Sequence, residues 1–373
     1  MGTGDTGTTG TTGTTGTTGT TGTTGTTTDT GTLPPEHFLV CADGSGDFLD
    51  IQEAIDAATP ASTIDVCPGT YGPITVNWGQ DVDIHGLQGR DVTFIDGNGL
   101  PAVDIDGGLL DMDGFTVTGD GYDPGDWQPA HAGGLNVFEG TASFRDMIVE
   151  DCTGPFTLQF DEDWLVIDNV IWRNNETTWL WYLWQGQNEW PMGSPPPPGW
   201  AIITNNTISG GHHTTIIETT KLEILELHHN VFEDITVEGG HTAFIFTQFN
   251  NGPLNVSNNV FYNIDDTLPW GGRLFSGSAD LRNNIVAGCD AYDVIPFDGS
   301  YNLFWDDGTS DYAGNINGVG NLFDTDPEWT DPAAGDFSLQ PTSPAIDAGD
   351  PDPAFDDPDG TRNDIGVTGG PVQ

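Results

Sequence analysis

Histidines and carboxylates gather in the middle of this chain, and these residue types carry out general acid and base catalysis. A histidine changes its charge near neutral pH, and a neighbouring carboxylate can orient it and tune its pKa. His213 and His241 lie about one repeat of the chain apart, with Glu218 between them. The candidate catalytic residues are Asp161, Asp163, Glu218, His213 and His241.

The cluster of histidines, which also includes His212, His228 and His229, has two interpretations that stay open. It can form a metal site or a general base paired with a carboxylate, or its members can occupy turn and strand-surface positions. His228 and His229 stand where a later repeat has Ser257 and Asn258, which favours the second interpretation for these two.

An aromatic segment covers residues 177–200 and holds five of the twelve tryptophans of the chain. Flat indole faces stack on the apolar faces of sugar rings, and aromatic clusters also anchor protein interfaces. Alternatively, Trp179 and Trp181 point into the core. The candidate ligand-binding residues are Trp179, Trp181, Tyr182, Trp184, Trp190 and Trp200.

The C-terminal segment is dense in aspartates. Hard carboxylate oxygens at close spacing suit Ca²⁺, although the spacing is not that of an EF-hand loop. The alternative is a solvated acidic tail. The candidate calcium ligands are Asp350, Asp352, Asp356, Asp357, Asp359 and Asp364.

A repeated block must position all these side chains. Two of its seven copies are Ile203-Thr204-Asn205-Asn206-Thr207-Ile208 and Val256-Ser257-Asn258-Asn259-Val260-Phe261, and successive copies follow each other at steps of 23 to 37 residues. Apolar and polar residues alternate on both sides of an Asn or Asp, which indicates two short strands around a corner. We expect the corner residue to adopt left-handed geometry and to use its side-chain amide.

The length of the repeat predicts a solenoid. A step near 24 residues fits one coil of three short strands, and stacked coils would align the corner asparagines in a hydrogen-bonded ladder. The longer steps are the same coil with a loop inserted, and such loops commonly carry function. Propeller blades need about 40 residues each, which the shorter steps do not supply.

The composition limits the partners. The 373 residues contain 57 Asp and Glu but only 7 Lys and Arg, so the formal net charge is −50. A chain this acidic cannot form a sizeable basic patch, which makes nucleic acid and anionic membranes poor partners. No stretch is long and apolar enough to span a membrane as a helix. An acidic surface with a single lysine suits a saline or calcium-containing exterior.

Residues 2–32 are almost entirely Gly and Thr, with Gly at every third position from Gly4 to Gly25. We expect a flexible tether, like those that follow the lipidated cysteine of bacterial surface lipoproteins, although that cysteine is not in this chain. The alternative is self-association of the Gly-Thr-Thr tract, since only Gly fits a crowded triplet-helix axis.

The four cysteines predict at most one disulfide. Cys41 and Cys67 flank an expected helix and lie in adjacent expected strands, so we expect them to pair. Cys152 and Cys289 lie five repeats apart, which is too far for a disulfide, so we expect two buried thiols.

Residues 38–72 are predicted to form a strand, a helix and a strand. Ile51, Ala54, Ile55 and Ala58 give the helix one apolar stripe, and an amphipathic helix can cover the open end of a solenoid. The stretch from Val40 to Tyr71 contains the segments Asp-Gly-Ser-Gly-Asp-Phe, Ile-Gln-Glu-Ala-Ile-Asp-Ala-Ala and Pro-Gly-Thr-Tyr.

These segments resemble the opening of pectin methylesterases and related proteins of the pectin-lyase-like superfamily. The repeats resemble the right-handed parallel β-helix of that superfamily, with its asparagine ladder. The stretch from Ser343 to Gly366 resembles the C-terminal segment of secreted bacterial β-helix proteins, which are often surface-anchored. The resemblance implies an all-β, right-handed parallel β-helix with an N-terminal capping helix.

The resemblance does not bring an activity with it. The paired-aspartate segments of the esterases, the arginine base of the pectate lyases and the Gly-His-Gly of the polygalacturonases have no matching motif here. We therefore expect an extracellular or cell-surface protein that binds polysaccharide and, if it is an enzyme, cleaves it by hydrolysis or elimination. The alternative is a structural or adhesive surface protein that assembles with itself.

Four segments follow from these patterns. They are a tether (1–37), an N-terminal cap (38–72), the coils (73–323) with the insertion 177–200, and an Asp-rich C-terminal segment (324–373).

Overall fold

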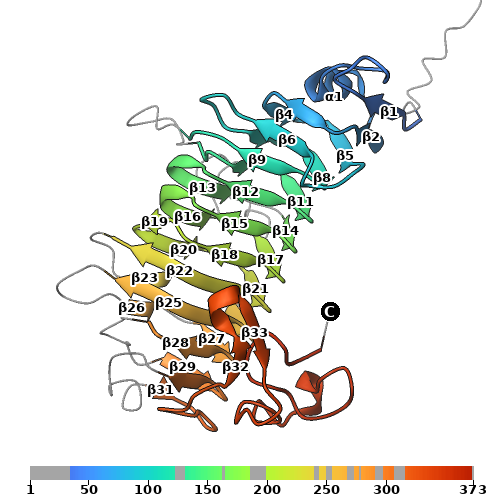
Figure 1. Ribbon diagram of the computed structural model, residues 1–373. Coiled ribbons are helices and arrows are strands. Elements are labelled where there is room, and N and C mark those ends of the chain that lie inside the picture. Colours follow the sequence, from blue (N-terminus) through green and yellow to red (C-terminus); the bar gives the residue numbers. More distant parts are fainter. Residues whose placement is uncertain are drawn as a thin grey trace, which may run out of the picture. The chain divides into compact units, whose positions relative to one another are not determined.

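The chain folds into stacked coils of parallel strands (Figure 1). The computed structural model describes residues 34–121, 131–161, 164–184, 199–238, 243–248, 254–266, 273–276, 279–289, 297–305 and 316–371. These residues lie in one compact unit, Pro34–Gln373. Residues 1–33 of the predicted tether, which include the Gly-Thr-Thr tract, fall outside the described residues, and the last residue of that segment, His37, begins the first strand.

Three ladders of parallel strands run along the coils, and the central coils contribute in turn to all three. In ladder A, every strand pairs with the strand one coil before and one coil after it. Its members are β1 (His37–Val40), β2 (Ser62–Val66), β5 (Asp81–Gly86), β8 (Leu109–Asp113), β11 (Thr141–Arg145), β14 (Trp164–Asp168), β17 (Trp200–Thr204), β21 (Ile224–His228), β24 (Leu254–Ser257), β27 (Asp280–Arg282), β29 (Phe297–Ser300) and β31 (Ile316–Asn317).

Ladder B follows ladder A around each coil and consists of shorter strands in its first half. Its members are β3 (Gly69–Tyr71), β6 (Thr93–Asp96), β9 (Thr116–Thr118), β12 (Ile148–Glu150), β15 (Ile171–Arg173), β18 (Thr207–Ser209), β22 (Val231–Val237), β25 (Val260–Asp266), β28 (Ile285–Ala287) and β30 (Leu303–Trp305).

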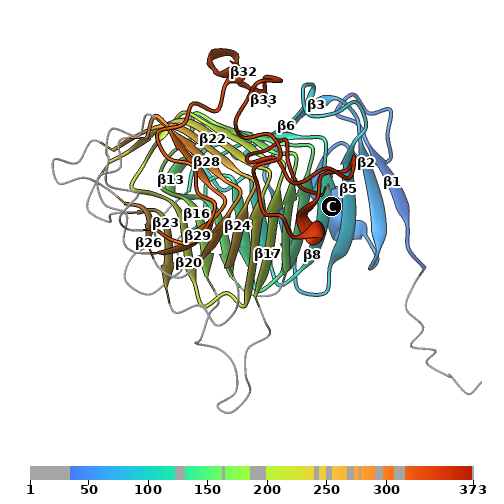
Figure 2. The ribbon, with the colours of Figure 1, turned by 90° about the horizontal axis from the view of Figure 1, so that it is seen from below.

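Ladder C completes the coil. Its members are β4 (Ile74–Asn77), β7 (Val103–Asp106), β10 (Leu135–Phe138), β13 (Thr153–Asp161), β16 (Glu176–Trp184), β20 (Thr215–Thr220), β23 (Ala243–Gln248) and β26 (Arg273–Ser276). The short strand β19 (His212–His213) pairs with both β16 and β22 and so joins ladders B and C. The parallel β-helix predicted from the repeats is therefore confirmed; Figure 2 shows the unit from a second direction.

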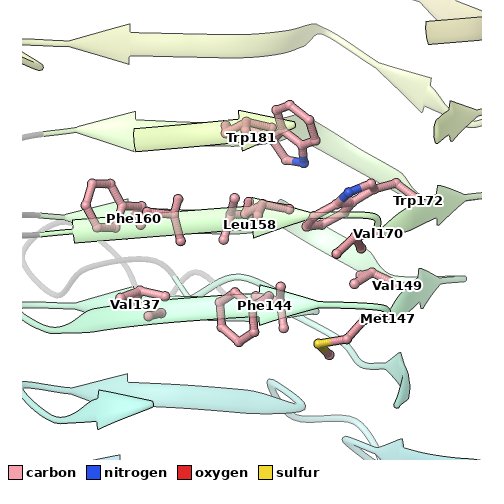
Figure 3. Close-up of a cluster of buried hydrophobic side chains, with 14 of the residues drawn as sticks. Val137, Phe144, Met147, Val149, Leu158, Phe160, Val170, Trp172 and Trp181 are labelled. Atoms are coloured by element: carbon pink, nitrogen blue, oxygen red, sulfur yellow. The ribbon is translucent and has the colours of Figure 1, made fainter. Parts of the chain in front are cut away.

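Alternation along each strand produces the core. Every second residue of ladder A points inward, as Phe144, Ile167 and Ile203 do in successive coils, and these side chains are fully buried. Figure 3 shows Phe144, Leu158 and Trp181 among the side chains that fill the interior. The residues between them point outward, so each ladder has an outer face on which polar and aromatic side chains are free to vary.

At the corner between ladders A and B, one residue turns the chain and the next residue supplies the ladder amide. The sequence pattern predicts a single residue for both roles. The residue with positive φ comes first, for example Asn205 (57°), His229 (58°) and Asn258 (54°). The buried amide that forms the ladder belongs to the next residue. Left-handed geometry turns the chain, and only the following side chain then points inward between the coils.

The asparagine ladder itself is confirmed. Asn230 Nδ2 donates to Asn259 Oδ1, and Asn259 Nδ2 donates to Asn284 Oδ1, both over 3.0 Å. Each amide oxygen also accepts the backbone N–H of the preceding coil's asparagine. The stacked members are Asn206, Asn230, Asn259, Asn284, Asn302 and Asn321.

Helix α1 (Ile51–Ala57) forms where the apolar stripe predicted it. Asp50 caps its first turn by accepting the N–H of Gln52 over 2.8 Å, and Ile51 and Ile55 are buried against β1, β2 and β4. That the helix serves as a cap for the solenoid end stays a prediction. The predicted disulfide Cys41–Cys67 is present.

The segment after ladder A's last strand folds back along that ladder (Figure 1, red). It contains an antiparallel pair, β32 (Trp329–Asp331) and β33 (Asp336–Leu339), and two short 3₁₀ turns, η2 (Pro332–Ala334) and η3 (Pro353–Phe355). Asn258 Nδ2 donates to the carbonyl oxygens of Asp364 and Gly366, both over 3.1 Å. The C-terminal segment therefore covers part of the outer face of ladder A. Within the described ranges, no helix has the length and apolarity needed to cross a membrane.

Candidate functional site

The outer face of ladder C brings together an aromatic cluster and two carboxylates. Strand register places Gln159, Tyr182 and Glu218 side by side in three successive coils. Asp161 lies two residues beyond Gln159 in β13 and therefore on the same side of the ladder. We call Phe156, Asp161, Trp179, Tyr182 and Glu218 the outer strip.

The aromatic rings of the outer strip contact one another. The Phe156 ring stacks on Tyr182 at a centroid distance of 4.9 Å and lies 5.3 Å from Trp179. The Trp179 indole meets Tyr182 edge to face at 6.0 Å. Trp179 and Tyr182 are half-buried, so part of each ring reaches the surface.

Hydrogen bonding fixes the orientation of the indole. Trp179 Nε1 donates to Glu218 Oε2 over 2.7 Å, a bond to a charged acceptor between strands of adjacent coils. Such bonds are stronger than bonds between neutral groups. The indole plane is therefore held in place before any ligand arrives.

The carboxylates of Glu218 and Asp161 both raise the pKa of the Tyr182 phenol. Burial first, and then the negative charges of Glu218 and Asp161, raise the pKa of Tyr182 to about 12. The phenol therefore keeps its proton across the physiological range and can donate a hydrogen bond. Asp161 is buried, with 3% of its surface exposed, although it is on the outer face of the sheet.

Polar side chains extend the outer face toward the N-terminal coils. Asn136 pairs in register with Gln159, and Asn136 Nδ2 donates to Asp104 Oδ1 over 2.6 Å. Asn136 Oδ1 and Gln159 Oε1 are buried and have no hydrogen-bond partner among the residues that the structure describes. Buried polar atoms normally have a partner, so these two oxygens are exceptions in the packing of the outer face. Asn136, Gln159 and Phe156 are not part of the repeat signal, so no sequence pattern singles them out.

His213 does not join this site. Its ring is buried with 2% exposure, and its Nδ1 lies 3.0 Å from the carbonyl oxygen of Thr177. Burial lowers the pKa of His213 to about 4, so it is neutral at physiological pH. The structure does not bring His213 and Glu218 together, because β19 directs His213 inward while Glu218 is on the outer face. Asp163 and His241 lie outside the described residues.

The predicted aromatic segment is divided between two faces. Residues 177–184 belong to strand β16, so the inserted part of 177–200 is shorter than expected. Trp181 is fully buried, edge-on to Trp172 and Phe232, and cannot bind a ligand. Trp200 lies in ladder A, where it packs on Trp164 at 4.4 Å.

The remaining predicted aromatic ligands are Trp184 and Trp190. Trp184 ends β16 in register with Asp161 and Thr220. Trp190 lies outside the described residues. Among the four predicted aromatic ligands whose side chains the structure describes, Trp179 and Tyr182 are therefore the two that it brings together on one surface.

The C-terminal aspartates are spread among hydrogen bonds of their own chain. Asp350 forms an ion pair with Arg282, Asp352 accepts the N–H of Ala354 at the start of η3, and Asp359 accepts from Thr361. Asp357 accepts the N–H groups of Asp364 and Gly370, and the Asp364 carboxylate accepts the N–H of Asp347. Asp356 follows η3, and its own N–H donates to Pro353.

These bonds bear on the calcium prediction. In the described part of the chain, no three His, Cys, Asp or Glu side chains converge as a metal site would require. The carboxylates stabilise turns of the C-terminal segment, and calcium binding by them stays a prediction.

Comparison with known proteins gives distant matches of fold. No protein-family model matches the chain, and no curated protein sequence matches it. A carrot pectin methylesterase structure is 13% identical, with 79% of this chain and 85% of that chain covered and a TM-score of 0.34.

Two further solved structures are similar at the same level. An alginate lyase from Paenibacillus is 13% identical over 77% of this chain and 97% of its own, with a TM-score of 0.29. The A-module of a mannuronan C-5 epimerase from Azotobacter vinelandii is 15% identical over 73% of this chain and 90% of its own, with a TM-score of 0.26. The chain is a right-handed parallel β-helix protein. Neither an activity nor a substrate follows from similarity at this distance.

Proposed function

We propose that the protein binds polysaccharide on the outer face of ladder C. The observation that carries the proposal is the outer strip, where the rings of Trp179 and Tyr182 lie beside the carboxylates of Glu218 and Asp161. A sugar ring presents an apolar face that stacks on an indole and hydroxyls that donate to carboxylates. Gln159 and Asn136, in register with Tyr182 in the two preceding coils, continue the polar outer face along the solenoid.

Charge favours a glycan without acidic groups. With a net charge of −50 and two carboxylates in the outer strip, the protein repels polyanionic glycans at moderate salt. We therefore propose a neutral polysaccharide as the ligand.

A glycan array read with matched variants tests the binding site. Trp179→Ala removes the oriented indole, and we expect it to weaken binding about tenfold, as the loss of a ring-stacking anchor does. Trp164→Ala is the matched control, because Trp164 is 44% exposed but lies on ladder A. No binding to any glycan by the unmodified protein, or an equal loss in both variants, would contradict the proposal.

Cleavage of the bound glycan is a second candidate function. Glu218 and Asp161 both raise the pKa of the Tyr182 phenol, so the two carboxylates lie near one residue of the outer face. Hydrolysis of a glycosidic bond uses a pair of carboxyl groups as acid and base. We expect Asp161→Asn and Glu218→Gln each to abolish release of reducing sugar while binding is retained. Binding without release by the unmodified protein would leave a pure binding protein.

An extracellular or cell-surface location is part of the proposal. The disulfide Cys41–Cys67 supports an oxidising compartment, since disulfides persist there and are reduced in most cytosols. The alternative of a self-assembling surface protein depends on the Gly-Thr-Thr tract. Sedimentation of the full chain and of a chain lacking residues 1–33 tests it, since assembly through the tract would be lost with it.

Calcium binding by the C-terminal aspartates stays a proposal that the observed hydrogen bonds do not favour. If Ca²⁺ binds Asp350, Asp357 or their neighbours, EDTA will lower the melting temperature and added Ca²⁺ will restore it. Equal melting temperatures with and without EDTA would end the proposal.

A further inference from the structure

A cleft lies on ladder A, on a different face from the outer strip. It has a volume of about 310 Å³ and is bounded by outward-facing residues of β21, β24 and β27 and by the C-terminal segment. Glu226, Asn255 and Asp280 follow one another in register across its floor, and His228, Ser257 and Arg282 form the next row. Phe355 and Pro371 of the C-terminal segment close its other side.

The two histidines of the cleft have defined protonation states. His229 Nε2 lies 2.7 Å from the carbonyl oxygen of Gly369, so it must carry the proton and donate. Burial lowers the pKa of both His228 and His229, in the case of His228 to about 4, so both rings are neutral. A neutral His229 with its proton on Nε2 has a bare Nδ1.

The pairing of the rings then fixes His228. The two Nδ1 atoms are 2.8 Å apart, so His228 Nδ1 donates to His229 Nδ1. The Nε2 atom of His228 is consequently an acceptor, and among the described residues it has no hydrogen-bond partner. The chain thus holds an uncharged acceptor in the wall of the cleft.

The other polar groups of the cleft are also mostly acceptors. Glu226 Oε1 accepts from Asn255 Nδ2 over 2.7 Å, and Asp280 Oδ2 accepts from Arg282 over 2.9 Å. The guanidinium of Arg282 is shared with Asp350 and lies over the Phe355 ring at 5.0 Å. The positive charge of the cleft is therefore neutralised, which disfavours an anionic ligand.

We propose that this cleft binds a small, uncharged polyhydroxylated molecule of the size of one sugar residue. Hydroxyl groups can donate to Glu226, to His228 Nε2 and to Asp280, and they can accept from the hydroxyl of Ser257. The volume is at the lower end of the range of small-molecule pockets, which suits a single ring. The site is independent of the proposed function, because its residues are on ladder A and the outer strip is on ladder C.

Ligand-observed NMR and calorimetry on the full chain test the site. The probes are glucose, galactose, mannose, xylose and myo-inositol at up to about 20 mM, since a ligand this small binds with a Kd of about 1 mM. We expect saturable binding of at least one probe, accompanied by a shift of the His228 ring ¹⁵N signals. Glucosamine and inorganic phosphate are tested in the same way, as a cationic and an anionic probe.

Two variants locate the binding. Ser257→Tyr fills the cleft from an outward position and should abolish binding, whereas Thr63→Tyr makes the same kind of change at an outward position of β2 that does not line the cleft. If Ser257→Tyr does not fold, Glu226→Gln keeps the shape of the side chain and should weaken binding about tenfold.

Distinct results separate this site from the outer strip. Trp179→Ala should leave binding of the small probe unchanged, and Ser257→Tyr should leave polysaccharide binding unchanged. The proposal is overturned if no neutral probe saturates, if only glucosamine or phosphate binds, or if Ser257→Tyr and Glu226→Gln bind as the unmodified protein does.

Discussion

Trp179 and Glu218, 39 residues apart in the sequence, are joined by a hydrogen bond of 2.7 Å from the indole N–H to the carboxylate. The bond links adjacent coils on the outer face of ladder C and orients both groups toward the same surface. At the proposed site, a sugar that stacks on Trp179 would therefore lie within reach of the Glu218 carboxylate.

Trp179→Phe separates these two contributions. Phenylalanine keeps an aromatic face but has no N–H, so Glu218 loses its fixed donor. We expect polysaccharide affinity to fall about three- to tenfold, less than for Trp179→Ala, because a stacking surface is retained while preorganisation is lost. Calorimetric titration with the best glycan from the array measures both variants. Equal affinities of Trp179→Phe and the unmodified protein would show that the hydrogen bond is unimportant for binding.

The asparagine ladder should be a large local contributor to stability. Asn259→Ala leaves the backbone N–H of Asn230 and the carbonyl oxygen of Leu227 buried without these partners. We expect the free energy of unfolding to fall by about 3 kcal/mol, since each buried unpaired group costs about 1–3 kcal/mol. Denaturant unfolding measures this loss.

Asn321→Ala is the matched control for the ladder, because Asn321 is the last of the stacked amides and is partly exposed. Water can replace the lost partners there, so we expect a loss of about 1 kcal/mol. Equal losses at both positions would contradict a role for burial.

His213 should make the protein less stable in acid. Its pKa falls from 6.5 in the unfolded chain to about 4 in the folded protein because burial disfavours the charged ring. A basic group whose pKa is lower in the folded protein than in the unfolded chain binds its proton more weakly when folded. The stability that the neutral ring allows is present above pH 6.5 and is lost as the pH falls from about 6.5 to about 4. The shift corresponds to a loss of about 3 kcal/mol.

His213→Gln isolates this effect, because glutamine is polar but does not titrate. The difference in unfolding free energy between the unmodified protein and the variant should shrink by about 3 kcal/mol between pH 7 and pH 4. A difference that does not change with pH would refute the assignment. NMR titration of the His213 ring gives an independent value of its pKa.

The cysteines should separate into one bridge and two unreactive thiols. The disulfide closes a loop with a sequence separation of 26, so its reduction should cost about 3 kcal/mol of stability. Cys152 and Cys289 are fully buried, and burial raises the pKa of the Cys152 thiol to about 12. Ellman's reagent should therefore detect no thiol in the native protein, two after denaturation, and four after denaturation and reduction. A rapid native reaction would contradict the burial of these thiols.

Local patterns in the sequence were sufficient to predict the solenoid, the helix at residue 51, the disulfide and the buried thiols. They also predicted the structural role of His229, which has the φ of 58° that its corner position demands. Strand alternation, corner geometry and the spacing of repeats depend on neighbouring residues, so a single chain displays them directly.

The face on which a side chain lies is a different kind of property. Trp181 and Trp200 are as aromatic as Trp179, but one points into the core and the other belongs to ladder A. The position at which each strand begins within its coil decides which face a side chain occupies. A shift of one residue turns an inward side chain outward. The inward position of His213 has the same origin.

The sequence by itself determined that the chain coils, because hydrophobic alternation and left-handed corners are local and recur. Only the tertiary structure decided which side chains meet. Register between coils placed Glu218 against Trp179, and the folding back of the C-terminal segment brought Asn363 to Asn258, 105 residues away. Such contacts depend on the stacking of whole coils, which the backbone hydrogen bonds between strands largely fix, and the residues next to each side chain do not display it.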